Sequence, residues 1–312
     1  MQPLVTLIVP GRDIATFAPA AIASLQAQSE SRWRAVLIDD GSRDDTGEVF
    51  ADAAASDLRF EVIHHDESLG LGAARNVGLT RVDTPYLGFM DADDELTPNA
   101  LSLWLNALEE SGSDFVVGAY ARSREIDGRY VSGRVQPWVA QATSPRRLAT
   151  TLERHPAASA NIVAWSKLSR TDFWAGRRFP ENVAYEDQIV AQQMYTEART
   201  FDVIPDIVAH WRVRADGTSI TQGKNRVPVL VDYLTALRGG IRVLHEAGAT
   251  AAVICRLELI LAMDLPPLRH IAETHPDLSY AAALDAFEFE LRALPEYSDA
   301  EPDPTLREAL AW

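Results

Sequence analysis

Short β-rich segments alternate with helical segments through the first 120 residues, and this alternation restricts the fold more than any other feature of the sequence. Two strands that flank a helix pair in parallel, because the helix carries the chain back along the sheet. The alternation therefore predicts an α/β protein with a mixed, mainly parallel sheet. We expect strands at residues 5–9, 35–38, 60–63, 86–90 and 115–119, and helices at 17–28, 46–55, 73–79 and 98–110.

The helix expected at residues 98–110 has the clearest boundaries. Thr97 is a residue type that caps helices, and Pro98 suits the first helical position. Four apolar residues from Leu101 to Leu108 then recur on one helical face. The sequence therefore predicts a helix that starts directly after Thr97.

The regular pattern weakens between residues 120 and 180, where basic residues gather. This segment holds eleven Lys and Arg against four Asp and Glu, a balance of +7 in a chain whose net charge is −16. We expect an irregular region here that faces a substrate. Helical periodicity resumes after Lys224 and continues to about residue 294.

The acidic balance and the single cysteine exclude several classes of protein. A net charge of −16 disfavours binding to nucleic acid through the whole surface. Cys255 has no partner for an internal disulfide. Charged residues interrupt the longest apolar stretch, residues 251–265, too soon for a membrane span, and we expect no signal peptide. The expected location is the cytoplasm, either free or at the inner face of the membrane.

The most informative motif is the run Asp91-Ala92-Asp93-Asp94-Glu95, between an expected strand and an expected helix. Clustered carboxylates repel one another unless a cation or solvent compensates their charge. Oxygen ligands suit Mg²⁺ or Mn²⁺, and the carboxyl ends of parallel strands are where open α/β sheets bind ligands. The run therefore predicts a divalent metal site. A solvated acidic loop before a helix is the alternative that the sequence leaves open.

Two further segments follow expected strands. The pair Asp39-Asp40 could accept hydrogen bonds from a nucleobase or a ribose, although a turn with Asx bonding is an equally good interpretation. The segment Gly70-Leu71-Gly72-Ala73-Ala74-Arg75-Asn76 places glycines, Arg and Asn at a helix start, which suits a diphosphate. It lacks the third glycine of a dinucleotide fingerprint, so a nicotinamide enzyme is improbable.

In order along the chain, these motifs resemble the family-2 glycosyltransferases of the GT-A fold, in particular those that build bacterial cell-wall and capsule polymers. The resemblance covers residues 4 to 220 approximately. It rests on Val5-Thr6-Leu7-Ile8-Val9-Pro10, Leu37-Ile38-Asp39-Asp40-Gly41-Ser42, Gly72-Ala73-Ala74-Arg75-Asn76, Phe89-Met90-Asp91-Ala92-Asp93-Asp94, Trp165-Ser166-Lys167-Leu168, Arg178-Phe179-Pro180-Glu181 and Tyr185-Glu186-Asp187-Gln188.

The resemblance implies a Rossmann-like GT-A domain over residues 1–222 with a helical extension over residues 223–312. Residues 1–120 would bind the nucleotide and residues 120–222 the acceptor. By similarity, Asp187 is the general base, and Asp93 with Asp91 holds Mn²⁺ or Mg²⁺. The residues expected at the nucleotide-sugar are Pro10, Arg12, Asp13, Asp39, Asp40, Arg75, Asn76, Asp91, Ala92, Glu186, Arg212, Arg214 and Ser219.

This similarity implies transfer of a sugar from a nucleoside diphosphate donor to an acceptor hydroxyl, with inversion. Uridine is our choice of base, although Pro10 is followed by Gly11-Arg12-Asp13 where the family commonly has an aromatic residue and Asn. The acceptor could be a glycan, a polyol-phosphate polymer or a lipid-linked glycan, and the chain could form a homo-oligomer. No Gln-x-x-Arg-Trp motif of processive synthases is found.

Three alternatives remain at this point. Glu186 and Asp187 could be two acids that stabilise the first turn of a helix. The chain could bind nucleotide sugars or carbohydrates without turnover, or it could be a nucleotidyltransferase on a related sheet.

Overall fold

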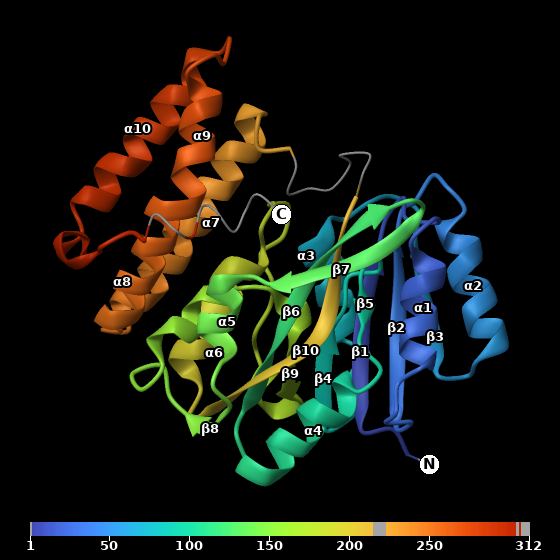
Figure 1. The fold of residues 1–312 in the computed structure, drawn as a ribbon. Coiled ribbons are helices and arrows are strands. Elements are labelled where there is room, and N and C mark those ends of the chain that lie inside the picture. The colour runs from blue at the N-terminus through green and yellow to red at the C-terminus, as the bar shows by residue number, and fades with distance from the viewer. Residues whose placement is uncertain (1, 215–222, 304–305, 307–312) are drawn as a thin grey trace.

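The computed structural model describes residues 2–214, 223–303 and 306. Within these residues ten strands form one twisted sheet, in the order β3-β2-β1-β4-β9-β6-β10-β5, with β7 beside β6 and β8 beside β10 (Figure 1). The strands are β1 (Val5–Gly11), β2 (Trp33–Asp40), β3 (Phe60–His65), β4 (Tyr86–Phe89), β5 (Glu95–Leu96), β6 (Phe115–Ile126), β7 (Arg129–Val135), β8 (Arg147–Thr150), β9 (Lys167–Arg170) and β10 (Phe201–Val213).

The sheet is mixed. Strands β3, β2, β1 and β4 run parallel, as do β6 and β10, while β9 lies antiparallel between β4 and β6. The five strands expected from the first 120 residues are all present, and β9 joins the two parallel groups. The predicted α/β class with a mixed sheet is confirmed.

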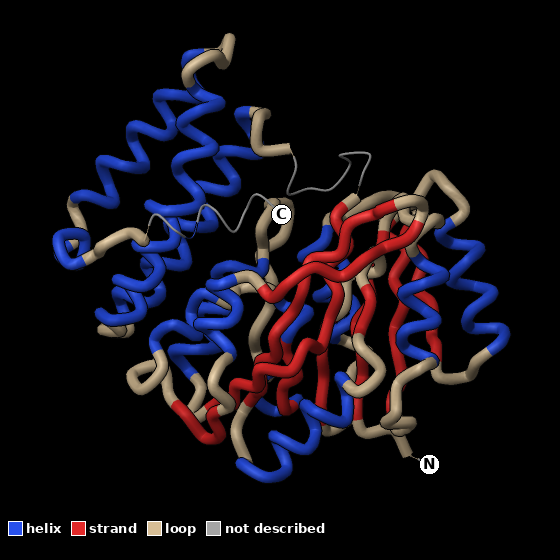
Figure 2. The backbone as a smooth tube through the Cα atoms, viewed as in Figure 1, coloured by secondary structure: helices blue, strands red, loops and turns tan. Residues whose placement is uncertain are grey.

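Helices cover both faces of the sheet (Figure 2). The α-helices are α1 (Ala18–Gln26), α2 (Thr46–Ser56), α3 (Leu71–Leu79), α4 (Ala100–Ser111), α5 (Pro137–Thr143), α6 (Asp187–Glu197), α7 (Val227–Glu246), α8 (Thr250–Leu259), α9 (Leu265–Ala272) and α10 (Leu278–Arg292). A π-helical turn, η5 (Ile260–Asp264), joins α8 to α9, and the 3₁₀ helices are η1 (Pro156–Ala160), η2 (Ala164–Ser166), η3 (Thr171–Trp174) and η6 (Pro295–Asp299).

Alternating side chains of the strands fill two hydrophobic cores. On β1, Leu7 and Val9 belong to the core beneath α1, α2 and α4, whereas Ile8 faces the core beneath α3 and α6. Apolar residues of α7, α8, α9 and α10 extend the second core, including Leu230 and Phe287. The C-terminal helices therefore pack against the same side of the sheet as the helix that begins at Asp187.

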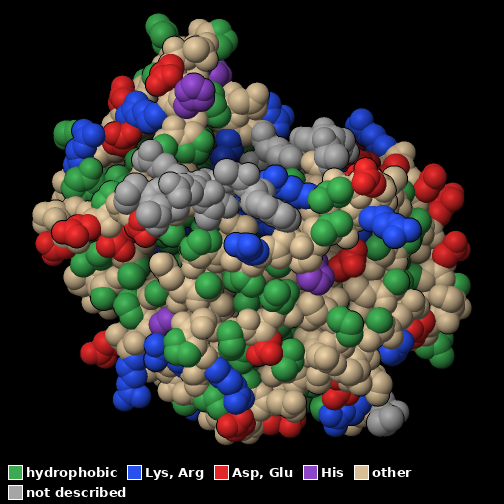
Figure 3. Space-filling view, viewed as in Figure 1, with side chains coloured by type: hydrophobic (Ala, Val, Ile, Leu, Met, Phe, Trp, Pro, Cys, Tyr) green, Lys and Arg blue, Asp and Glu red, His purple; other side chains and the backbone are tan. Residues whose placement is uncertain are grey.

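The character of the helices and the distribution of acidic side chains on the surface can be described directly. No helix in residues 2–214 and 223–303 combines the length and the apolar character needed to cross a bilayer. On the face drawn in Figure 3, acidic side chains gather along the edge formed by α2, where Glu48 and Asp52 are exposed.

The expected start of α4 was wrong. The helix begins at Ala100, and Thr97 makes no capping bond to it. Residues 95–96 instead pair with β10 as β5, and the Thr97 hydroxyl donates to the carbonyl of Ile207 at 2.8 Å. Pairing with a distant strand, which a local pattern does not reveal, takes the side chain that would have capped the helix.

Helix α3 lies very close to the segment that precedes α6. The amide of Asn76 bonds both backbone groups of Phe179, and a Cβ on Gly72 would lie 2.0 Å from the carbonyl oxygen of Pro180. Only glycine permits this approach. The contact fixes residues 179–181 against α3, and thereby the entry to α6.

Substitution of Gly72 tests this contact. We expect Gly72→Ala to lower the free energy of unfolding by about 1–3 kcal/mol, because the added methyl group forces two backbone segments apart. Gly240→Ala is the matched control in a helix, since its Cβ meets only ordinary contacts at 3.4 Å or more. Urea denaturation of both variants provides the measurement, and equal stability of the two would contradict the predicted clash.

Candidate active site

A large cleft of about 900 Å³ lies where the parallel strands β1, β2 and β4 end. Its walls come from the turns after these strands, from β6, from the first turn of α6 and from the C-terminal helices. Ligands bind at this edge in open α/β sheets because the strand ends and helix starts meet there. Asp93 and Asp187 both line this cleft, so the sequence-predicted metal ligand and base face one space.

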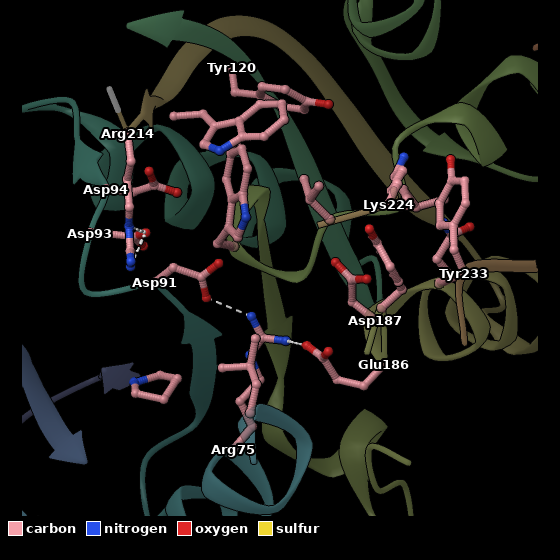
Figure 4. Close-up of a pocket in the computed structure, with 18 of the residues that line it drawn as sticks. Arg75, Asp91, Asp93, Asp94, Tyr120, Glu186, Asp187, Arg214, Lys224 and Tyr233 are labelled. Atoms are coloured by element: carbon pink, nitrogen blue, oxygen red, sulfur yellow. Dashed lines mark hydrogen bonds and ion pairs between the residues drawn. The ribbon is translucent and has the colours of Figure 1, made fainter. Parts of the chain in front are cut away.

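The guanidinium of Arg75 joins the two sides of the cleft (Figure 4). It extends from α3, is only 1% exposed, and donates to Asp91 Oδ1 at 2.6 Å and to Glu186 Oε1. Burial opposes the charge of Arg75, but the nearby carboxylates, Asp91 before Glu186, raise its pKa above the ordinary value. Arg75 therefore remains charged and ties the turn after β4 to the start of α6.

Three carboxylates of the acidic run converge at the other side of Arg75. The side chains of Asp91, Asp93 and Asp94 offer oxygens that lie within 4.8 Å of one another. One oxygen of each accepts a hydrogen bond, from Arg75 to Asp91, from Arg214 to Asp93 and from the Arg212 backbone to Asp94. The second oxygens accept none from the residues that the structure describes.

The electrostatics of this cluster favour a cation. Burial raises the pKa of Asp94 well above its ordinary value, and repulsion by Asp93 and then Asp91 adds to the rise. Burial also raises the pKa of Asp91, although Arg75 opposes it. Hard oxygen ligands whose negative charge Arg75 and Arg214 compensate only in part fit Mg²⁺ or Mn²⁺. Glu95, the last acid of the run, pairs with Arg212 instead.

Arg212 holds the acidic turn from behind. Its side chain is 3% exposed, and it donates to the carbonyl oxygens of Asp93, Asp94 and Phe17. It does not line the cleft, whereas Arg214 does and pairs with Asp93 at 2.7 Å. The structure therefore gives the two arginines, which the sequence did not distinguish, different surroundings.

Asp187 is the first residue of α6 and faces the cleft. Burial and then repulsion by Glu186 raise its pKa to about 7, against the opposing charge of Arg75. A carboxyl group with this pKa can accept a proton at neutral pH and still be largely ionised slightly above it.

Lys167 supports the cleft wall next to Asp187. This β9 residue is 2% exposed, and its ammonium donates to the carbonyl of Val163 at 2.7 Å and to both oxygens of Asn161. Burial lowers its pKa to about 7, while Asp187 opposes that shift. Lys167 therefore fixes residues 161–163, which carry part of the lining.

The two acids after β2 differ in position. Asp40 lines the cleft, and its carboxylate accepts bonds from His65, from Ser68 and from the amides of residues 69 and 70. Although burial opposes ionisation, these hydrogen bonds, with His65 first, lower the pKa of Asp40. Asp39 lies outside the lining and bonds His64 and the amide of Ser42.

The other sequence-predicted residues divide into three groups. Pro10, Arg12, Asp13, Ala92 and Glu186 line the cleft. Asn76 holds residues 179–181 and does not line it. Ser219 lies outside the described residues.

Sequence reasoning left several residues in and behind the lining unassigned. Lys167 holds residues 161–163 from behind the lining, and it stood in a motif but received no role. Arg256 lines the cleft and was noted only as an interruption of an apolar stretch. Arg122 and Lys224 also line the cleft, as do six aromatic side chains. These aromatic residues are Tyr120, Trp138, Trp165, Tyr185, Trp211 and Tyr233. The excess of basic residues between 120 and 180 was the sequence feature that could have indicated Arg122 and Lys167.

The mixed sheet with a cleft at its strand ends and an acidic turn after β4 defines a GT-A-like transferase. Comparison with known families gives the particular assignment. The profile "Glycosyl transferase family 2" matches residues 6–178, more than half of the chain. The chain belongs to this family and is a glycosyltransferase.

Curated relatives of the chain are bacterial glycosyltransferases. GlyG of Streptococcus pneumoniae is 24% identical over 228 residues, which cover 71% of this chain and 75% of GlyG. GlyA of the same species is 25% identical over 236 residues, which cover 74% of this chain but 34% of GlyA. The similarity to GlyA therefore concerns one part of that longer protein.

Solved structures support the fold. Residues 1–349 of TarS from S. aureus, in complex with UDP, match with a TM-score of 0.74 and 20% identity, covering 100% of this chain and 87% of that one. The mannosyltransferase PcManGT from Pyrobaculum calidifontis, in complex with GDP-Man and Mn²⁺, matches with a TM-score of 0.60 and 17% identity, covering 100% and 86%.

Removal of Arg75 tests its place at the centre of the site. We expect Arg75→Met to lower the free energy of unfolding by about 3–5 kcal/mol, because the buried carboxylate of Glu186 and the partly buried one of Asp91 lose their partner. Arg146→Met, which breaks an exposed pair with Glu110, should cost about 1 kcal/mol or less. Urea denaturation compares them, with Arg75→Lys as a charge-preserving variant should the Met variant not fold. Similar losses for Arg75→Met and Arg146→Met would show that Arg75 does not hold the site together.

Proposed function

We propose that this chain transfers a sugar from a uridine diphosphate donor to an acceptor hydroxyl, with a divalent cation and with inversion at the anomeric carbon. The observation that carries the proposal is that the acidic cluster and Asp187 line one cleft, on either side of Arg75. Structures of TarS in complex with UDP and with UDP-GlcNAc support the choice of donor.

The cluster of Asp91, Asp93 and Asp94 is the proposed metal site, and the Mn²⁺ in the PcManGT structure supports it. A bound Mn²⁺ or Mg²⁺ would neutralise the charge that develops on the departing diphosphate. The residues themselves supply the oxygen ligands, and Arg212 holds their turn in a fixed position. Arg214, on the cleft side of the same turn, is placed to meet a phosphate.

The nucleoside has a proposed position at the ends of β1 and β2. Pro10, Arg12, Asp13 and Asp40 line this part of the cleft. The guanidinium plane of Arg12 can stack on a base where an aromatic residue is missing. The proposed domain boundaries are those expected from the sequence. Residues 1–222 form the proposed catalytic domain, with the nucleotide-binding half up to residue 120, and residues 223–312 form the helical extension.

Asp187 is the proposed general base. Its carboxylate takes the proton of the acceptor hydroxyl while the acceptor oxygen bonds to the anomeric carbon and the bond from that carbon to the diphosphate breaks. Glu186 is bonded to Arg75 and is therefore not proposed as a second nucleophile. Direct displacement from the face opposite the diphosphate inverts the configuration.

The pH dependence of Asp187 gives the sharpest test. We expect kcat/KM to rise with pH and to level off above about 7, because only the ionised carboxylate accepts a proton. Asp187→Asn should lower transfer by about 100-fold or more and leave UDP binding intact. Asp172→Asn, an exposed acid outside the cleft, is the matched control. Full activity of Asp187→Asn would exclude this base, and a wild-type protein that binds donor without turnover would be a binding protein.

The thermal stability of the protein should also depend on pH through the ionisation of Asp187. The pKa of Asp187 is raised on folding, so its ionisation destabilises the folded state as pH rises from about 4 towards 7. Asp187→Asn removes this effect, and its Tm should exceed that of the wild type at pH 8 but not at pH 4. A Tm difference that does not depend on pH would contradict the raised pKa.

Replacement of Asp93 tests the metal site. We expect Asp93→Ala to abolish Mn²⁺-dependent binding of UDP in isothermal titration, because the cluster loses one of the three carboxylates that line the cleft. Asp66→Ala, an exposed acid outside the cleft, should bind as the wild type does. UDP affinity that is the same with and without Mn²⁺ in the wild type would contradict the proposed site.

A further inference from the structure

A basic wall lies on the side of Asp187 away from the acidic cluster. Arg122 from β6, Lys224 from the segment before α7 and Arg256 from α8 all line the cleft there. In Figure 4, Asp187 lies between the acidic residues Asp93 and Asp94 on one side and Lys224 on the other. Three segments far apart in the sequence thus bring positive charge to one place.

Arg256 gives the strongest indication that this wall binds an anion. Its side chain is only 7% exposed, yet its guanidinium makes no hydrogen bond or ion pair with any residue in the described part of the chain. A buried cation without a partner is costly, because water no longer solvates it fully. An anion that enters the cleft would supply the partner.

The other two cations are also without carboxylate partners in the described residues. Arg122 stacks on Trp211, with its guanidinium carbon 4.7 Å from the ring centre, and its buried Nε has no hydrogen-bond partner. The Lys224 ammonium lies 3.6 Å from the centre of the Tyr233 ring. Asp264 is an acid of the lining on this side: it accepts the hydroxyl of Tyr233 at 2.6 Å, and its charge partly opposes the lowering of the Lys224 pKa by burial. Positive charge exceeds negative charge at this wall.

The position of the basic wall relative to Asp187 places it on the acceptor side of the cleft. The donor diphosphate belongs at the acidic cluster, and the acceptor hydroxyl belongs at Asp187, so an anion beyond Asp187 is part of the acceptor. Trp138, Trp165 and Trp211 line the same region, and aromatic faces pack well against the apolar faces of sugars. The wall therefore combines surfaces for a carbohydrate and for an anion.

We propose that Arg122, Lys224 and Arg256 form a subsite for a phosphate ester carried by the acceptor, which makes the acceptor a sugar phosphate or polyol phosphate. This inference rests on the proposed function of the cleft. Three cations from three separate segments that line one cleft suit a tetrahedral group with several oxygens better than a planar carboxylate, which offers two.

Isothermal titration with glycerol 3-phosphate tests the subsite while saturating UDP and Mn²⁺ occupy the donor site. Glycerol 3-phosphate should bind to the wild type, and glycerol, its uncharged counterpart, should not. Arg256→Gln should weaken this binding by about tenfold or more, because a charge-assisted hydrogen bond is lost. Arg154→Gln, which removes an exposed arginine outside the cleft, should leave it unchanged.

Two controls separate the possible failures. Removing a buried charge that has no partner among the described residues should keep or raise the Tm of Arg256→Gln, so weaker binding would not reflect misfolding. UDP binding should be equal in the wild type and in Arg256→Gln. If Arg256→Gln weakens UDP binding equally, the cations serve the donor, and the acceptor subsite is excluded.

Binding of the two ligands to the wild-type protein shows whether this inference fails alone or together with the proposed function. Binding of UDP with Mn²⁺ but not of glycerol 3-phosphate would overturn the subsite and leave the donor proposal standing. Absence of UDP binding would overturn both.

Discussion

The buried ion pairs of Arg75 are the constraint on which the site depends. The acidic turn after β4 and the start of α6 are almost a hundred residues apart in sequence, and both carry carboxylates that repel one another. Arg75 stands between them, bonded to Asp91 on one side and to Glu186 on the other. Gly72 and Asn76, on the same helix, hold the segment before α6 against α3. Helix α3 therefore positions both halves of the cleft.

Charge changes sign across the cleft. Three carboxylates gather at the end of β4, Asp187 lies near the middle, and three cations line the wall beside the C-terminal helices. Under the proposed function, the acidic end would receive the diphosphate together with a divalent cation, and the basic end would receive an anion of the acceptor. The net charge of −16 hides this arrangement, because most acidic residues lie elsewhere on the surface.

Much of the fold could be predicted from local patterns. Alternating strand and helix signals located β1, β2, β3, β4 and β6, because each of these strands contains a short apolar segment within an alternation of strands and helices. The placement of β9 and β5 could not be predicted, since both pair with strands that lie far away in sequence. For the same reason Thr97, a residue type that caps helices, bonds β10 instead.

The candidate site was predictable where its residues lie in motifs. Asp91, Asp93, Glu186 and Asp187 stood in short quoted segments, and the structure brings them to one cleft. The contacts of Lys167 with residues 161 and 163 and the place of Arg256 in the cleft depend on the tertiary fold, so a short sequence motif could not predict them. Arg212 shows the opposite case: a motif suggested a phosphate contact, whereas its guanidinium bonds the backbone behind the acidic turn.

Anomalous diffraction from crystals grown with Mn²⁺ and a UDP-sugar would test the central claim most directly. The account predicts a manganese peak within coordination distance of the Asp93 carboxylate, with the anomeric carbon of the donor facing Asp187. A peak at another site, or a donor sugar that points away from Asp187, would contradict it.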